Sequence, residues 1–212
     1  MENLHKIYDE MQLKYGDPNL NAIYGGGCTH NAKVCLVFMN PTKRNIASVK
    51  SWKGVRYQWL GTKQVWDFLE KLGLISKQLN TQIQNRKPKD WTEDFCKQVY
   101  LEVTQNGVYI TNLAKCTQVD ARPLNDSVFK EYRNYLLQEI EMVNPQKILL
   151  FGNQVSSIVL NQKITVSTCR KQKFELLISG NVYNAYAVYY PVGNGRFNID
   201  KCVEDCKFNL DN

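Results

Sequence analysis

The sequence predicts a three-layer α/β/α sandwich with a central, mostly parallel four-stranded sheet. Four short runs are continuously apolar rather than alternating, which is typical of strands covered on both faces. These runs alternate along the chain with segments of helical spacing, the order expected of an α/β fold. The expected strands are 33–39 (KVCLVFM), 107–111 (GVYIT), 147–151 (KILLF) and 186–190 (YAVYY).

The expected helices follow from apolar residues that recur every three or four positions. They cover 64–72, 91–103, 126–143 and 153–160, and a further C-terminal helix carries Cys202 and Cys206. Asp90 is the expected N-cap of the second helix. The polar, basic stretch Asn80 to Lys89 (NTQIQNRKPK) is interpreted as a surface loop. Because no linker or internal repeat divides the chain, we expect one domain over residues 1–212.

Composition limits the classes of protein that the chain can belong to. Lys and Arg number 27 against 20 acidic residues, a net charge of +7, which favours polyanionic partners without identifying one. No run approaches the roughly 20 apolar residues of a membrane span, so we expect no membrane partner. The first residues lack the apolar core of a signal peptide, and seven cysteines cannot all pair within the chain. We therefore expect a reduced, monomeric protein of the cytoplasm, or of the nucleus in a eukaryote.

Polar residues follow the expected strands where a parallel sheet places its ligand site. Asn40 and Asn112 come directly after the first two strands, Asn153 follows the third after a single glycine, and Tyr190 ends the fourth. The carboxyl ends of parallel strands lie at one edge of the sheet, so these side chains should lie near one another. Taken from the residues alone, Asn40 before Pro41 is also compatible with a turn, and Asn112 with a cap.

Several blocks, in conserved order along the chain, resemble the uracil-DNA glycosylase superfamily. Met39-Asn40-Pro41 resembles the first active-site loop of the single-strand-selective and mismatch-specific branches. Trp59-Leu60-Gly61 and the runs VYITNLAKC (108–116) and NPQKILLFG (144–152) are similar to motifs of the iron–sulphur branch. The resemblance implies a glycosylase fold and a DNA partner that contains uracil or other damage. The implied activity is excision of uracil or another deaminated base in base excision repair.

The resemblance also implies roles for individual residues. Asn40 would orient the attacking water, since a carboxamide oxygen accepts a hydrogen bond. Asn112 would read the edge of a flipped-out uracil, and Trp59, or less favourably Tyr57, would stack on the base. The alternative interpretation is that Trp59 is a structural residue of the hydrophobic core. Met39 and Pro41 would complete the substrate-binding loop, and Tyr190 would be the second catalytic residue.

DNA-binding residues are expected in two segments that flank the implied site. The stretch 191–198 (PVGNGRFN) is similar in position to the DNA-inserting loop of the family, and its glycines allow a close approach to phosphate. The alternative for such basic segments is a solvated surface. The residues assigned to DNA binding are Thr42, Lys43, Arg44, Lys115, Asn194 and Arg196.

Three departures from the family pattern bear on activity. The family's final His-Pro-Ser motif corresponds to Tyr190-Pro191-Val192, and a Tyr hydroxyl can still donate a hydrogen bond to an oxyanion. Phe38 and Thr42 replace glycines of the first motif, which predicts a narrower pocket. Only Cys116 matches a cluster ligand of the iron–sulphur branch, so we expect no metal, cluster or other cofactor.

Three functions remain in competition on this basis. The first is a DNA glycosylase, which predicts a base-sized pocket that joins Asn40, Trp59, Asn112 and Tyr190. The second is a catalytically inactive relative that binds nucleic acid or a protein partner. The absence of the His of the final motif favours this alternative. The third is a nucleotide- or nucleoside-processing enzyme on the same architecture.

Overall fold

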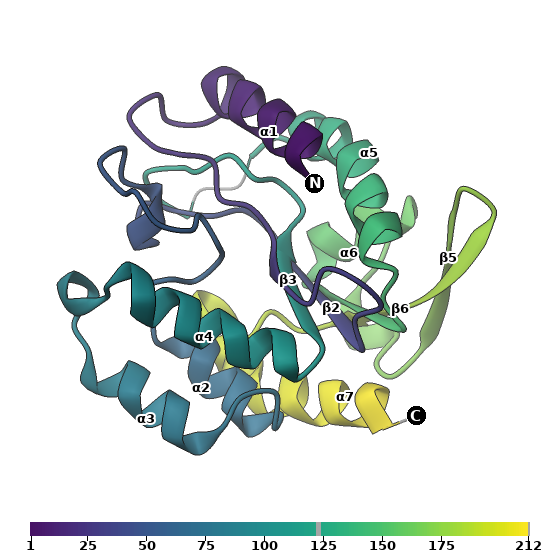
Figure 1. Cartoon of the computed structure of the whole chain (residues 1–212). Coiled ribbons are helices and arrows are strands. Elements are labelled where there is room, and N and C mark those ends of the chain that lie inside the picture. Colours follow the sequence, from purple (N-terminus) through teal and green to yellow (C-terminus); the bar gives the residue numbers. More distant parts are fainter. Residues whose placement is uncertain (122–123, 212) are drawn as a thin grey trace.

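The four apolar runs form four neighbouring parallel strands. The computed structural model describes residues 1–121 and 124–211. The strands are β2 (Val34–Phe38), β3 (Val108–Asn112), β4 (Lys147–Phe151) and β6 (Asn181–Val188), arranged in the order β3-β2-β4-β6 (Figure 1). The predicted parallel core of the sheet is therefore confirmed.

Two antiparallel strands extend this core to six strands. The two-residue β1 (Gly26–Gly27) pairs with β3, and β5 (Lys173–Ile178) pairs with β6. A tight turn joins β5 to β6, with Ser179 and Gly180 at φ 49° and 87°, and two successive positive φ values are typical of a hairpin turn. These strands escape a search for continuous apolar runs, because β1 is only two glycines and β5 alternates buried with more exposed residues.

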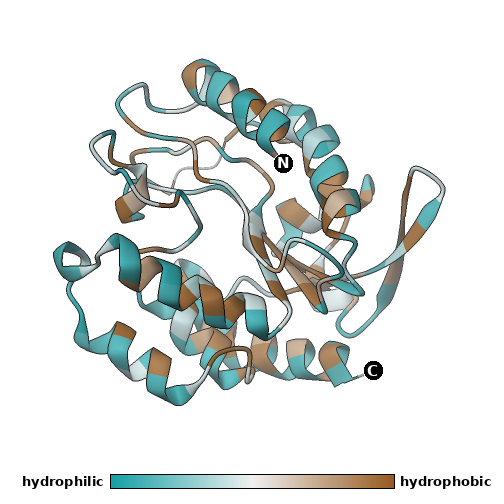
Figure 2. Cartoon of the chain, viewed as in Figure 1, coloured by the Kyte–Doolittle hydropathy of each residue, from teal (hydrophilic) through white to brown (hydrophobic). Residues whose placement is uncertain are grey.

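Helices cover both faces of the sheet and confirm the three-layer sandwich. One layer contains α1 (Glu2–Tyr15), α5 (Asp126–Val143) and α6 (Asn153–Leu160). The other contains α2 (Gln64–Lys71), α3 (Lys77–Asn85), α4 (Glu93–Gln105) and α7 (Ile199–Asp211) (Figure 1). Apolar residues concentrate on the strands and on the inward helix faces (Figure 2). Within the described residues, no helix combines the length and apolarity needed to cross a membrane.

Two local predictions were wrong, namely the loop at 80–89 and the N-cap at Asp90. In both places a Ser or Thr cap, rather than the composition of the segment, determines where the helix begins. The stretch from Asn80 to Lys89 is largely helical rather than a loop, since α3 runs to Asn85. Ser76 caps α3 by accepting a hydrogen bond from the Leu79 amide at 3.1 Å. The cap of α4 is Thr92, whose hydroxyl accepts from the Phe95 amide at 3.2 Å, whereas Asp90 ends the short η2 turn (Pro88–Asp90).

Alternation along the strands separates two cores and decides where site residues point. In β2, Phe38 faces the α2/α4 side, whereas Val37 faces the α5 side. Asn112, at the end of β3, is the register partner of Phe38. Its neighbour Thr111 contacts α5 through Glu139, so Asn112 points to the α2/α4 side. The site therefore lies at the carboxyl end of the sheet, on that side.

Buried phenols and thiols make the fold sensitive to alkali. Burial raises the pKa of Tyr100 and Tyr109 well above the usual range, and raises the pKa of the Cys96 thiol to about 12. In the unfolded chain these groups ionise at about pH 10 and about pH 8.5. Above these values the native state holds more protons, so stability falls as pH rises. We expect the thermal unfolding midpoint, followed by circular dichroism, to fall steadily above about pH 9; a constant midpoint up to about pH 11 would contradict this.

Candidate active site

The carboxyl ends of β2, β3 and β4 place three side chains in one row. Asn112 pairs in register with Phe38, and the Phe38 ring stacks on Phe151 of β4 with centroids 4.3 Å apart and planes 4° from parallel. The chain leaves β2 into Asn40 and leaves β6 into Tyr190. The topology thus brings Asn40, Asn112 and Tyr190 to the same edge of the sheet, as the sequence predicts.

Asn112 is held by a residue that sequence reasoning missed. Its Nδ2 donates a hydrogen bond to Oε1 of Gln58 at 2.9 Å, and its Oδ1 has no partner among the described residues. Asn112 and Gln58 are each only 1% exposed. Gln58 lies in the long loop between β2 and α2, directly before Trp59. Only its place beside the predicted stacking residue could have signalled a role.

Two more site residues carry unpaired polar atoms. Asn40 is 7% exposed, and its Nδ2 donates to the Pro41 carbonyl at 3.2 Å. Neither Asn40 Oδ1 nor the indole Nε1 of Trp59 finds a partner in the described part of the chain. An unsatisfied buried polar atom costs about 1–3 kcal/mol, so such atoms are rare without a functional reason. Of the seven such atoms in the described residues, three, counting Asn112 Oδ1, belong to residues that the sequence assigns to one site.

Aromatic rings fill much of the space between these residues. The rings of Trp59 and Tyr190 contact Phe38 edge-on, with centroids 5.0 Å and 6.0 Å away. Tyr57, the alternative stacking residue, packs on Tyr100 instead. The predicted pocket that joins Asn40, Trp59, Asn112 and Tyr190 is closed in this structure, because both amides are buried. The Phe38 ring lies between Trp59 and Tyr190 and contacts both.

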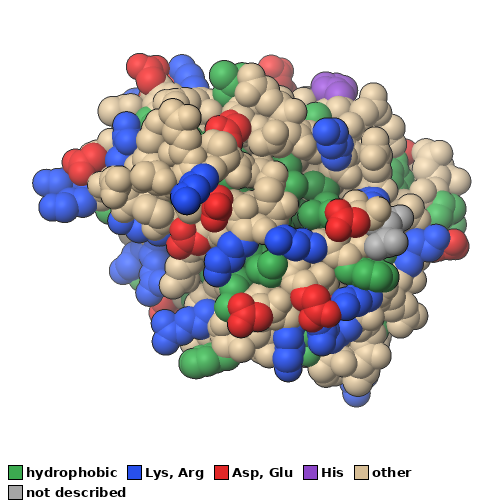
Figure 3. Space-filling view, turned by 90° about the horizontal axis from the view of Figure 1, so that it is seen from below, with side chains coloured by type: hydrophobic (Ala, Val, Ile, Leu, Met, Phe, Trp, Pro, Cys, Tyr) green, Lys and Arg blue, Asp and Glu red, His purple; other side chains and the backbone are tan. Residues whose placement is uncertain are grey.

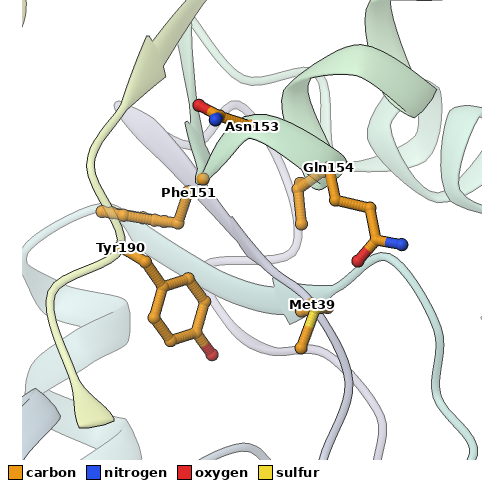
Figure 4. Close-up of a pocket in the computed structure, with 7 residues that line it drawn as sticks. Met39, Phe151, Asn153, Gln154 and Tyr190 are labelled. Carbon is orange, nitrogen blue, oxygen red and sulfur yellow. The ribbon is translucent and has the colours of Figure 1, made fainter. Parts of the chain in front are cut away.

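A small open pocket lies next to this closed site. It measures about 200 Å³ and is lined by Met39, Phe151, Gly152, Asn153, Gln154, Val155 and Tyr190. Figure 4 shows the Tyr190 hydroxyl directed into the space on the Met39 side. Burial raises the pKa of Tyr190 above its ordinary value, so the phenol stays protonated and acts as a hydrogen-bond donor. Of the residues assigned from sequence, Met39 and Tyr190 line this pocket.

Most of the residues assigned to DNA binding are accessible. Lys43 and Arg44 are exposed, and Thr42 is half-buried, where its hydroxyl accepts from the Arg44 amide at 3.4 Å. Asn194 and Arg196 are exposed on the η4 turn (Gly193–Asn198). The face in Figure 3, seen from below the view of Figure 1, carries basic and acidic side chains that are interspersed rather than gathered in one basic patch.

The η4 turn also carries a residue that sequence reasoning missed. Phe197 follows Arg196 and is 82% exposed, an unusual position for a large apolar ring. The Arg196 guanidinium lies over its ring, 5.4 Å from the centroid. An aromatic residue in a glycine-containing loop was the available signal. The pair offers an exposed apolar ring and a positive charge on the turn that follows Tyr190 along the chain.

The assignment of Lys115 to DNA binding was wrong. Lys115 is fully buried, and its Nζ lies 2.7 Å from Oε2 of Glu139 on α5. It also donates to the backbone carbonyl of Asn112. Tyr8, Tyr109 and Thr111 donate to the same carboxylate. Although burial raises the pKa of Glu139, the Lys115 ammonium and these hydrogen bonds lower it overall, which keeps the carboxylate ionised.

Cys116, the one match to a cluster ligand, lies in the α5-side core. Burial raises the pKa of its thiol to about 11, so the group remains a protonated core side chain at neutral pH. Across residues 1–121 and 124–211, no three His, Cys, Asp or Glu side chains gather in an arrangement suited to a metal ion.

The comparison with protein-family models supports the resemblance that the motifs indicate. A search of curated protein sequences finds no match to this chain. The family model for the uracil DNA glycosylase superfamily matches residues 24–204, which includes the sheet, the Asn40 loop and the η4 turn. Because this match covers most of the chain, the protein belongs to the uracil DNA glycosylase superfamily.

Proposed function

We propose that the chain hydrolyses the N-glycosidic bond of uracil, or of a deaminated base with the same hydrogen-bonding edge, in DNA. The observation that carries this proposal is the state of the Asn112 amide. One of its N–H groups is used by Gln58, which leaves one N–H donor and the Oδ1 acceptor without partners in the described chain. Uracil presents an N3–H donor next to the O4 acceptor, so its edge complements these two groups.

Asn40 and Tyr190 supply the remaining chemistry in this proposal. The bond of the Asn40 amide to the Pro41 carbonyl leaves Oδ1 to accept a hydrogen bond from the attacking water. The water oxygen bonds to C1′ while the C1′–N1 bond breaks and its electron pair passes to the base. The water gives up one proton to solvent and the released base takes one up, so the products are an abasic sugar and the free neutral base. The neutral Tyr190 hydroxyl donates a hydrogen bond to the O2 atom on which negative charge develops.

Access to the buried amides requires a movement, and Trp59 is the residue best placed to make it. Its backbone φ is 62°, a conformation that bulky residues rarely adopt. Such strain persists where the surroundings impose it and is released when they change. Rotation of Trp59 away from Phe38 would offer the indole face to a flipped base. The Arg196–Phe197 pair would then occupy the gap left in the duplex.

The test is single-turnover cleavage of a labelled oligonucleotide that contains one uracil, with alkali to break the abasic product. Parallel substrates carry hypoxanthine or xanthine, in single strands and in duplexes. We expect uracil excision by the wild type and a loss of at least about 100-fold in Asn40→Ala, because the water is no longer oriented. Asn19→Ala, which removes an exposed amide that is not among the assigned site residues, should cleave at the wild-type rate.

A second candidate function, a catalytically inactive relative that binds nucleic acid, is favoured by one observation. The Phe38 ring packs against Trp59, Phe151 and Tyr190 within the predicted site, and the Asn40 and Asn112 amides are buried. The same assay separates the two candidates. No cleavage of any substrate at enzyme excess, together with salt-sensitive binding to the same strands, would reject excision and favour the binding function.

A further inference from the structure

We propose that Gln58 is a positioning residue that decides which atom of the Asn112 amide faces the base, and thereby sets the preference for uracil over cytosine. The inference deepens the function proposed above and rests on it. It concerns a residue outside the motifs that point to the family, and it follows from a chain of three hydrogen-bonding groups that begins at a backbone carbonyl.

An unrestrained Asn side chain does not by itself distinguish uracil from cytosine. Its oxygen and nitrogen have nearly the same size, so a rotation of 180° exchanges an acceptor for a donor without changing shape. With Oδ1 toward N3 the amide accepts the N3–H of uracil. With Nδ2 toward N3 it donates to the unprotonated N3 of cytosine. Discrimination therefore requires a neighbour that permits only one orientation.

The Ile23 carbonyl sets the direction of the chain of hydrogen bonds. A carbonyl oxygen can only accept, so the amide of Gln58 must turn its Nε2 toward it, at 3.3 Å. This directs Oε1 of Gln58 to Asn112, and an oxygen without hydrogen can again only accept. Asn112 must therefore turn its Nδ2 to Gln58, at 2.9 Å. Oδ1 is left on the side away from Gln58, in the orientation that suits uracil.

Gln58 is itself held in place by its surroundings. The Tyr100 hydroxyl donates to the Gln58 backbone carbonyl at 2.8 Å, and Nδ2 of Asn45 donates to the neighbouring Tyr57 carbonyl at 2.8 Å. Both Gln58 and Asn112 are almost completely buried. Solvent therefore does not offer substitute partners that would allow either amide to reverse. Reversal of Asn112 would place its Oδ1 against Oε1 of Gln58, and reversal of Gln58 would place two N–H groups against one another. Either reversal costs a hydrogen bond.

Two substitutions of Gln58 distinguish its effect on the orientation of the Asn112 amide from its contribution to packing. Gln58→Glu keeps an acceptor oxygen toward Asn112, either as the carboxylate or as the acid that donates its O–H to Ile23. Gln58→Leu keeps a similar volume but no polar group. In single-turnover assays with uracil and cytosine substrates, we expect Gln58→Leu to lower the uracil-to-cytosine rate ratio by at least about tenfold. Gln58→Glu should keep the ratio within about threefold of wild type, as should the exposed control Gln162→Leu.

A nuclear magnetic resonance measurement tests the chain of hydrogen bonds from Ile23 through Gln58 to Asn112 without relying on catalysis. The side-chain amide signals of Asn112, identified by their loss in Asn112→Ala, should show one strongly hydrogen-bonded proton in the wild type and in Gln58→Glu. That signature should disappear in Gln58→Leu. An unchanged Asn112 signal or an unchanged rate ratio in Gln58→Leu would overturn the inference. If the wild type excises no base while the signal responds as expected, the proposed function and the specificity role both fall, and only the orientation of Asn112 stands.

Discussion

Replacing Tyr190 with Phe should slow uracil excision by about 100- to 1000-fold, the usual effect of removing one donor to a developing oxyanion. The substitution removes only the hydroxyl and keeps the edge-on contact of the ring with Phe38, so the fold should be retained. Single-turnover rates on a uracil oligonucleotide measure the effect. A rate within about threefold of wild type would show that Tyr190 does not replace the missing His.

Tyr189→Phe is the matched control, since it removes a phenol from the neighbouring half-buried residue. It should cleave at the wild-type rate. The pH dependence supplies a second check on Tyr190. Because burial raises its pKa above the ordinary value, the hydroxyl remains a donor throughout the neutral range. We therefore expect no loss of rate attributable to Tyr190 between about pH 6 and about pH 9.

Replacing Lys115 with Met should lower the free energy of unfolding by about 3–5 kcal/mol, the typical cost of breaking a buried ion pair from one side. Methionine fills a similar volume but leaves the Glu139 carboxylate buried without its cation. It also leaves the Asn112 carbonyl without the Lys115 donor. Urea denaturation followed by tryptophan fluorescence measures the change.

Two further variants show whether the buried charge is the cause. Lys115→Met combined with Glu139→Gln removes both charges and should recover part of the lost stability. Lys14→Met breaks an exposed ion pair with Glu131 and should leave the free energy of unfolding unchanged within error. If Lys115→Met were as harmless as Lys14→Met, the ion pair would be irrelevant to folding.

Sequence patterns predicted the strands in which nearly every residue is buried. The central strands are covered on both faces, so β2 and β4 appear as unbroken apolar runs. The hairpin strand β5 is covered on one face only and lacks such a run. The α3 helix is polar and depends on its Ser76 cap and its packing, and composition therefore suggested a loop.

The candidate site was predictable where a residue ends a strand, and less so elsewhere. Asn40, Asn112 and Tyr190 follow from the topology of parallel strands, which fixes their common edge. Lys115 lies only three residues beyond Asn112, yet the chain turns its side chain into the interior toward Glu139. That direction depends on α5 of the opposite layer, which no local pattern reveals. Gln58 was missed for the same reason, since its partners Ile23 and Asn112 are distant in sequence.

Asn112 is held at two points. Lys115, whose side chain turns to Glu139 of α5, binds its backbone carbonyl, and Gln58, in the loop between β2 and α2, binds its side-chain amide. The residue has therefore already lost its rotational freedom when the protein folds. Ordering a free side chain at an interface costs about 0.5–1.5 kcal/mol. For Asn112 that entropy is spent in folding rather than at each encounter with DNA, so a base that reaches the site meets a preorganised edge.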